Sequence, residues 1–197
     1  MLPVSELNRM RRALVDAMSR SVDVSDTIKH RPTSAQTSVT EMLAKVGSGL
    51  SPAPATTPTL HVLCRSADQI EAALASGVTE LYIDFEDIRL YADAVKRVKD
   101  QGTARIYLAT PRIQKSGEAG FFKLISRAEP HGVLIRNLGA ISFFKDEGIP
   151  VTGDFSLNVS NPLTAEYLKQ TGLERLTISY DLNVDQVLNL LQGAPPE

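Results

Sequence analysis

Short apolar runs alternate with stretches of helical periodicity along most of this sequence, from Leu60 onward. The runs are rich in Val, Ile, Leu and Tyr and recur at intervals of roughly 18 to 28 residues. They read LHVLC, ELYIDF, ARIYLA, GVLIR, PVTGDF and RLTISY. Strands this apolar have no face suited to water, which is typical of parallel strands covered by helices. The pattern therefore predicts about six consecutive parallel strand-helix units.

The expected helices carry recognisable start and stop signals. Ser66 and Gln69 have the spacing of a capping box, and Asn161 is a capping residue followed by Pro162 at the first helical position. Asn183 stands before the last helical stretch in the same way. The glycines that stand where helices should end are Gly77, Gly102, Gly148 and Gly172. These signals predict the approximate ends of the helices.

Two α/β architectures fit such repeats, an open doubly wound sheet and a TIM-type (βα) barrel. The first is favoured when a Gly-rich phosphate loop follows the first strand, but the segment CRSADQ occupies that turn. The regular short repeats favour the barrel, which needs eight units to close, so we expect an incomplete barrel. An unclosed barrel exposes two strand edges. We expect the remainder of the barrel or a second chain to cover them.

The chain before the first strand has a different texture. Residues 1–22 predict an amphipathic helix, with Leu7, Met10 and Leu14 at helical spacing. Residues 23–58 are rich in Ser, Thr, Pro and Ala and predict a mostly disordered linker with a short helix near residues 39–46. Residues 59–197 then form the partial barrel domain.

Composition narrows the function classes. The 197 residues carry a formal net charge of -2, which gives no overall attraction to nucleic acid or to an anionic membrane. No apolar run approaches the roughly 20 residues of a membrane helix, and a signal-peptide core is missing from the N-terminus. The lone Cys64 excludes a disulfide framework and a cysteine-only metal centre, and it fits a small buried side chain better than a nucleophile. We therefore expect a cytoplasmic protein without a membrane partner.

Polar side chains follow the predicted strands, at the edge where barrels bind their ligands. If the strands are parallel, these side chains converge on one rim and suit a small polar or anionic ligand. The candidate ligand-binding residues are Asp84, Glu86, Arg112, Arg136, Asn137, Asp154, Asn158, Tyr180 and Asp181. No metal ligand set is expected among them.

Each candidate also has a structural interpretation. The acidic run at residues 84–87 suits a metal or acid/base chemistry, but carboxylates that open a helix also favour its dipole. Arg112 and Arg136 suit carboxylate or phosphate contacts and equally suit structural ion pairs. His61 and His131 belong to no triad or metal motif, and the chain lacks the spacing of known catalytic motifs. The residues therefore predict where a site lies and leave its catalytic residues and reaction unknown.

Several segments resemble one family. The stretches LATPRI, GVLIRNLG, GDFSLNVSN and GLERLTISYDLN are similar to the barrel segments of the collagenase-like U-32 peptidases, and PVSELNRMRR is similar to the segment that precedes a barrel-like region in longer members. The resemblance covers Pro3 to about Ser21 and then Thr59 to Leu191. It implies a TIM barrel and a protease, that is, a hydrolase.

The resemblance also implies alternatives. Other members resemble oxygen-independent hydroxylases, which use an iron-sulfur cluster and act on RNA or on a quinone precursor. The cysteine-rich block that follows the SYDLN-type segment in similar proteins does not follow it here, so we expect a fragment that is catalytically incomplete and holds no cofactor itself. An iron-sulfur cluster is expected only in a full-length relative, and RNA as a partner only through the resemblance. The third interpretation is a non-catalytic barrel module that binds a ligand or a partner.

Overall fold

The computed structural model describes residues 4–21 and 57–193. They belong to two compact units. The first contains α1 (Val4–Ser21), which agrees with the predicted N-terminal helix. Its side chains Met10, Leu14 and Val15 are more than half exposed. The predicted linker and the short helix predicted within it lie outside the described residues, except for positions 57 and 58.

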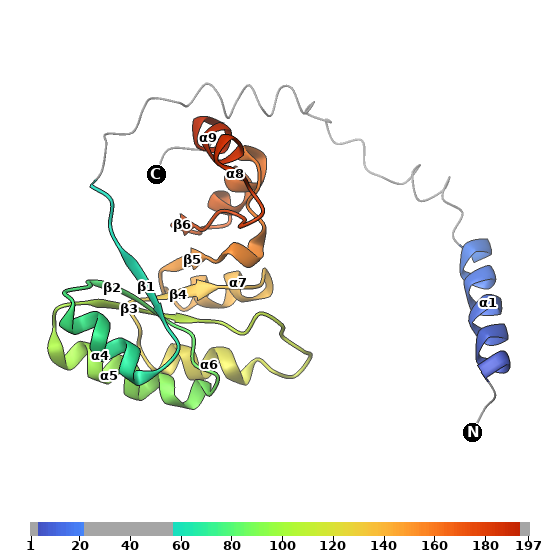
Figure 1. The fold of residues 1–197 in the computed structure, drawn as a ribbon. Coiled ribbons are helices and arrows are strands. Elements are labelled where there is room, and N and C mark those ends of the chain that lie inside the picture. Colours follow the sequence, from blue (N-terminus) through green and yellow to red (C-terminus); the bar gives the residue numbers. More distant parts are fainter. Residues whose placement is uncertain (1–3, 22–56, 194–197) are drawn as a thin grey trace. The chain divides into compact units, whose positions relative to one another are not determined.

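The second unit is built on a parallel sheet of six strands within the described residues (Figure 1). The strands are β1 (His61–Cys64), β2 (Glu80–Ile83), β3 (Arg105–Ala109), β4 (Gly132–Ile135), β5 (Val151–Gly153) and β6 (Arg175–Leu176). Each strand pairs with the next one in the sequence, so the order never reverses. A doubly wound sheet requires such a reversal, whereas a barrel winds in one direction. The curled sheet is the predicted incomplete barrel.

Helices follow the strands and lie on the outer side of the curl (Figure 1). They are α4 (Ala67–Ala75), α5 (Tyr91–Gln101), α6 (Gly120–Arg127), α7 (Gly139–Asp146), α8 (Pro162–Gln170) and α9 (Val184–Gly193). Two single turns of 3-10 helix, η1 (Ile88–Leu90) and η2 (Phe155–Leu157), follow β2 and β5. Of the helices within residues 4–21 and 57–193, none combines the length and the apolar character needed to cross a membrane.

The predicted caps are present, with one correction. Ser66 Oγ accepts a hydrogen bond from the Gln69 amide, but the Gln69 side chain accepts from the Arg65 amide rather than from Ser66. Asn161 caps α8 as predicted, and Asn183 accepts from the backbone amide at the start of α9. The four predicted glycines have positive φ values between 68° and 104°, a backbone region that other residues avoid. Local sequence therefore determines most helix ends.

The two faces of the sheet bury different side chains. Successive residues of a strand point to opposite faces. Leu81, Ile106 and Val133 belong to the main core cluster, which also includes helix residues and lies under the helices. Tyr82, Tyr107, Ala109 and Leu134 form a second buried cluster, on the inner face. The concave side of the curled sheet is therefore filled by its own aromatic and aliphatic side chains.

The sixth predicted strand is shorter than expected. RLTISY predicts a strand over residues 175–180, but β6 contains Arg175 and Leu176 alone, and Ile178 makes an isolated parallel bridge with Val159. Its neighbour β5 ends at Gly153 because the chain turns into η2, which leaves β6 without a continuous partner. The second and fifth predicted strands likewise end two residues early, at Ile83 and Gly153, ahead of η1 and η2.

Gly132 makes room for the inner cluster, which gives a test of the fold. A Cβ atom at Gly132 would lie 2.6 Å from ring carbons of Tyr107 and 3.0 Å from the Pro150 carbonyl oxygen. Gly132→Ala should therefore lower the free energy of unfolding by about 1–3 kcal/mol, measured by urea denaturation. Gly120→Ala is the control, because nothing lies within 4 Å of the added Cβ. Equal stabilities of the two variants would contradict the close packing at Tyr107.

Candidate functional site

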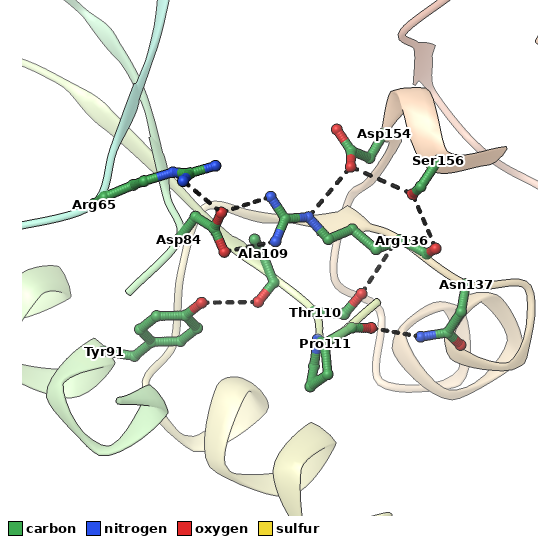
Figure 2. A network of polar contacts seen from close by, with 10 residues as sticks. All are labelled: Arg65, Asp84, Tyr91, Ala109, Thr110, Pro111, Arg136, Asn137, Asp154 and Ser156. Atoms are coloured by element: carbon green, nitrogen blue, oxygen red, sulfur yellow. Dashed lines mark hydrogen bonds and ion pairs between the residues drawn. The ribbon is translucent and has the colours of Figure 1, made fainter. Parts of the chain in front are cut away.

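Three strand ends meet at one buried arginine (Figure 2). Arg136 follows β4, and its Nη1 and Nη2 donate to the two carboxylate oxygens of Asp84 over 2.5 and 2.8 Å. Arg136 Nε lies 3.2 Å from Asp154 Oδ2, an ion pair without hydrogen-bond geometry. Asp84 follows β2 and Asp154 follows β5. We call these three residues the acidic-arginine triad, and it ties the ends of β2, β4 and β5 together.

The backbone of the rim positions Arg136 for these contacts. Its amide donates to Thr110 Oγ1 over 2.9 Å, and its carbonyl oxygen lies 2.9 Å from Ser156 Oγ (Figure 2). On the intervening strand β3, the inner face at this level carries the small side chain of Ala109, which is buried. The side chain of Arg136 can therefore extend across β3 to Asp84, which follows β2.

The triad is largely shielded from water. The side chains of Arg136 and Asp154 are each 6% exposed, and that of Asp84 is 19% exposed. Two carboxylates and one guanidinium leave a net negative charge, which Arg65 compensates from the solvent side with Nε 3.8 Å from Asp84 Oδ2. Removing one partner of a buried ion pair leaves the other charge uncompensated, so the triad is a structural requirement of this rim.

These contacts favour the charged state of Asp84. Burial by itself would raise the pKa of the carboxyl group, but the hydrogen bonds and the charge of Arg136 outweigh it. The charges of Arg65 and Arg112 act in the same direction, so the pKa of Asp84 lies below its ordinary value. Burial would likewise lower the pKa of Arg136, and the bonds to Asp84 raise it instead.

Two further hydrogen bonds hold the neighbouring backbone. The Tyr91 hydroxyl donates to the Ala109 carbonyl oxygen over 3.0 Å, and burial raises the pKa of this hydroxyl, which keeps its proton in place. Asn137 Nδ2 donates to the Pro111 carbonyl oxygen over 2.8 Å. Both carbonyl oxygens belong to the end of β3 and the loop after it, so this loop starts from a fixed position.

An aromatic stack extends the rim towards β6. The rings of Phe155 and Tyr180 lie 4.2 Å apart between centroids and only 13° from parallel. The guanidinium carbon of Arg112 lies 4.8 Å from the Phe155 ring centroid, a cation-π contact. Tyr180 is 72% exposed, so the stack ends in a surface that solvent reaches.

A hollow of about 420 Å³ lies beside the triad. It is lined by Arg65, Asp84, Phe85, Glu86 and Arg112. Arg65, Glu86 and Arg112 are exposed at its surface, and the half-buried Asp84 forms its inner wall. Its volume lies in the range of small-molecule sites, and four of its five lining residues are charged.

The structure distributes the nine sequence candidates over these features. Asp84, Arg136 and Asp154 form the triad, and Glu86 and Arg112 line the hollow with Asp84. Tyr180 ends the aromatic stack, and Asn137 bonds to backbone. Asn158 is exposed and ends η2 in the left-handed conformation, with φ of 54°, and Asp181 is exposed after Tyr180. The last two are not joined to the triad or the hollow.

Sequence reasoning missed aromatic contributors to this region. The sequence pattern predicts Phe85 and Phe155 as the last residues of strands, but Phe85 lines the hollow and Phe155 makes the cation-π contact. Both directly follow an aspartate of the triad, so an aromatic residue after a rim aspartate is the signal that could have found them. Tyr91 lies at the start of α5, and no local pattern marks its bond to β3.

The other residues with candidate chemistry lie in structural positions. Cys64 is fully buried, and burial raises the pKa of its thiol. His131 Nδ1 accepts a hydrogen bond from the Ile106 amide over 3.0 Å. Asp87 caps η1 and forms an ion pair with Arg89. In the described part of the chain, no group of three or more His, Cys, Asp or Glu side chains is placed to hold a metal ion.

Comparisons with known proteins do not assign this rim to a family. A scan against protein-family models found no match, and a search of the curated proteins found no significant relative. The function therefore has to be inferred from the residues and their geometry.

The triad predicts how stability depends on pH. Asp84→Asn should lower the free energy of unfolding by about 3 kcal/mol at neutral pH, because Arg136 loses its charged partner. The folded-state pKa of Asp84 is depressed, so its contribution is present above the unfolded value of about 3.9 and is lost as pH falls through the folded value. Urea denaturation between neutral pH and pH of about 3 should show the difference from wild type shrinking.

Asp100→Asn is the matched control, since Asp100 is exposed near the end of α5. Its effect should stay within about 0.5 kcal/mol. A difference between wild type and Asp84→Asn that stays constant with pH would contradict a charged Asp84 in the folded state.

Proposed function

We propose that this chain is a barrel segment of the collagenase-like U-32 peptidase family and that its rim binds a small polar ligand carrying an anionic group. The similarity of the four rim segments supports the family, which is named for proteolysis, a hydrolase activity. The contribution we assign to this segment is recognition of the ligand. The lone Cys64 suits a reducing compartment, so we also propose a cytoplasmic location.

The observation that best supports the proposed function is that three arginines at one rim differ in burial and in charge pairing. Arg136 is buried and neutralised by two carboxylates, whereas Arg65 and Arg112 are exposed and line the hollow. Among the described residues, no carboxylate lies within ion-pair distance of Arg112, and its ring contact with Phe155 leaves the N-H groups able to donate. An exposed guanidinium of this kind binds carboxylate or phosphate through two parallel hydrogen bonds.

The buried triad supports this role by keeping the hollow in shape. Asp84 forms one wall and is fixed by its two bonds from Arg136. Asn137 and Tyr91 hold the start of the loop that carries Arg112. A site whose supporting residues are already ordered spends less conformational entropy when a ligand binds. The arrangement therefore favours binding to a preformed site.

Replacing Arg112 tests this proposal. In titrations of the full chain with inorganic phosphate and with acetate, followed by NMR, Arg112→Gln should weaken binding by about 10- to 100-fold, because the bidentate charged contact is replaced by at most one neutral hydrogen bond. Arg127→Gln on the exposed face of α6 removes the same charge away from the hollow and should leave the dissociation constant unchanged. Equal affinities of the two variants would overturn the assignment of Arg112 to ligand binding.

Glu86 distinguishes an anionic ligand from a cationic one. Its carboxylate lines the same hollow and repels an anion. Glu86→Gln should therefore tighten phosphate binding by about two- to threefold, as expected for an exposed charge. Weaker phosphate binding by this variant would show that Glu86 takes part in holding the ligand.

A further inference from the structure

A second cavity adjoins the hollow on the outer side of the sheet. Its volume is about 460 Å³, and it lies between α4 and the η1-α5 segment. Its apolar lining consists of Ala67, Ile70, Phe85, Leu90 and Ala94. Ile70 is fully buried and Ala94 is 4% exposed, whereas Leu90 is 49% exposed. The cavity is therefore a groove with a buried apolar floor and an apolar lip open to solvent.

The groove and the hollow share walls. Arg65, Phe85 and Glu86 line both of them. Arg65 is 68% exposed and stands at this junction, so a charged group bound to Arg65 and Arg112 lies next to the apolar floor of the groove. Two neighbouring spaces with a guanidinium at their junction match a ligand with a charged end and an apolar end.

The charges along the groove determine which end of such a ligand lies where. The wall formed by η1 and α5 carries Asp93, which repels an anion, and Glu86 at the junction does the same, whereas Asp87 is paired with Arg89. Its cation, Arg97, is already paired with Glu71 over 2.9 Å. An anionic group is therefore disfavoured inside the groove and favoured at the Arg65 end.

We propose that the ligand of this rim is a free anionic amphiphile, with its carboxylate between Arg65 and Arg112 and its single aliphatic chain in the groove. This inference rests on the proposed function for the position of the anion and adds the apolar half of the ligand. Burial of the chain against Ile70 and Phe85 supplies affinity in proportion to chain length.

Chain length is the quantity that tests the inference. Acetate, hexanoate and decanoate are titrated into the full chain by NMR or calorimetry, below the concentration at which decanoate forms micelles. Each buried methylene should tighten binding by about two- to fourfold, and decanoate has four more methylenes than hexanoate, so it should bind about 10- to 250-fold more tightly. Decanol, which has the same chain without the charge, should bind more weakly than decanoate.

A larger side chain in the groove should remove the gain in affinity with chain length and leave anion binding unchanged. Ala67 lies at the first position of α4 and lines the groove, whereas Ala72 lies on the same helix outside it, and both are exposed. Ala67→Leu should reduce decanoate affinity to that of hexanoate and leave phosphate affinity unchanged. Ala72→Leu should behave as wild type in both titrations.

The outcomes separate the two proposals. Decanoate that binds no more tightly than acetate, while phosphate binding still depends on Arg112, would overturn the amphiphile and leave the proposed function intact. Equal affinity for decanol and decanoate would show an apolar groove that works without the anion site, which also overturns the amphiphile. Failure of phosphate and acetate to bind at all would overturn the proposed function itself.

Discussion

The ion pairs of Arg136 with Asp84 and Asp154 are the interactions on which the rim depends. Removing three charged groups from water costs free energy. This cost is offset only while all the contacts between the three groups are present. Because the three residues follow β2, β4 and β5, they fix the ends of these strands relative to one another. The positions of the exposed groups at the rim follow from this buried contact.

The inner face of the sheet explains why an incomplete barrel has a buried concave side. Tyr82 and Tyr107 stack with ring centroids 4.9 Å apart, and Gly132 leaves the space that the Tyr107 ring occupies. Above this layer the small Ala109 lets Arg136 cross β3. Large side chains therefore fill one layer of the inner face, and the small Ala109 leaves space for the Arg136 side chain in the next layer. Side chains fill the interior of a closed barrel in similar layers.

The fold followed from the sequence more completely than the site did. Strand-helix alternation and the caps at Ser66, Asn161 and Asn183 are local signals, so the elements and their order were predictable. The partner of Asp84 was not, because Arg136 lies 52 residues away and the pairing depends on strand register and on the size of Ala109. The sequence predicts that the rim residues lie at one edge of the sheet. It does not predict which of them form ion pairs with each other.

The difference between the three arginines indicates which of them carries a bound anion. The triad has a net negative charge, and Arg65 is the cation that compensates it from solvent. A ligand that drew Arg65 away from Asp84 would leave the negative charge of the triad less well compensated. The free energy of that loss would lower the affinity for the ligand. Arg112 contacts an uncharged ring and contributes less than Arg65 to the compensation of Asp84. The anion should therefore gain most of its binding free energy from Arg112, with Arg65 shared between the ligand and Asp84.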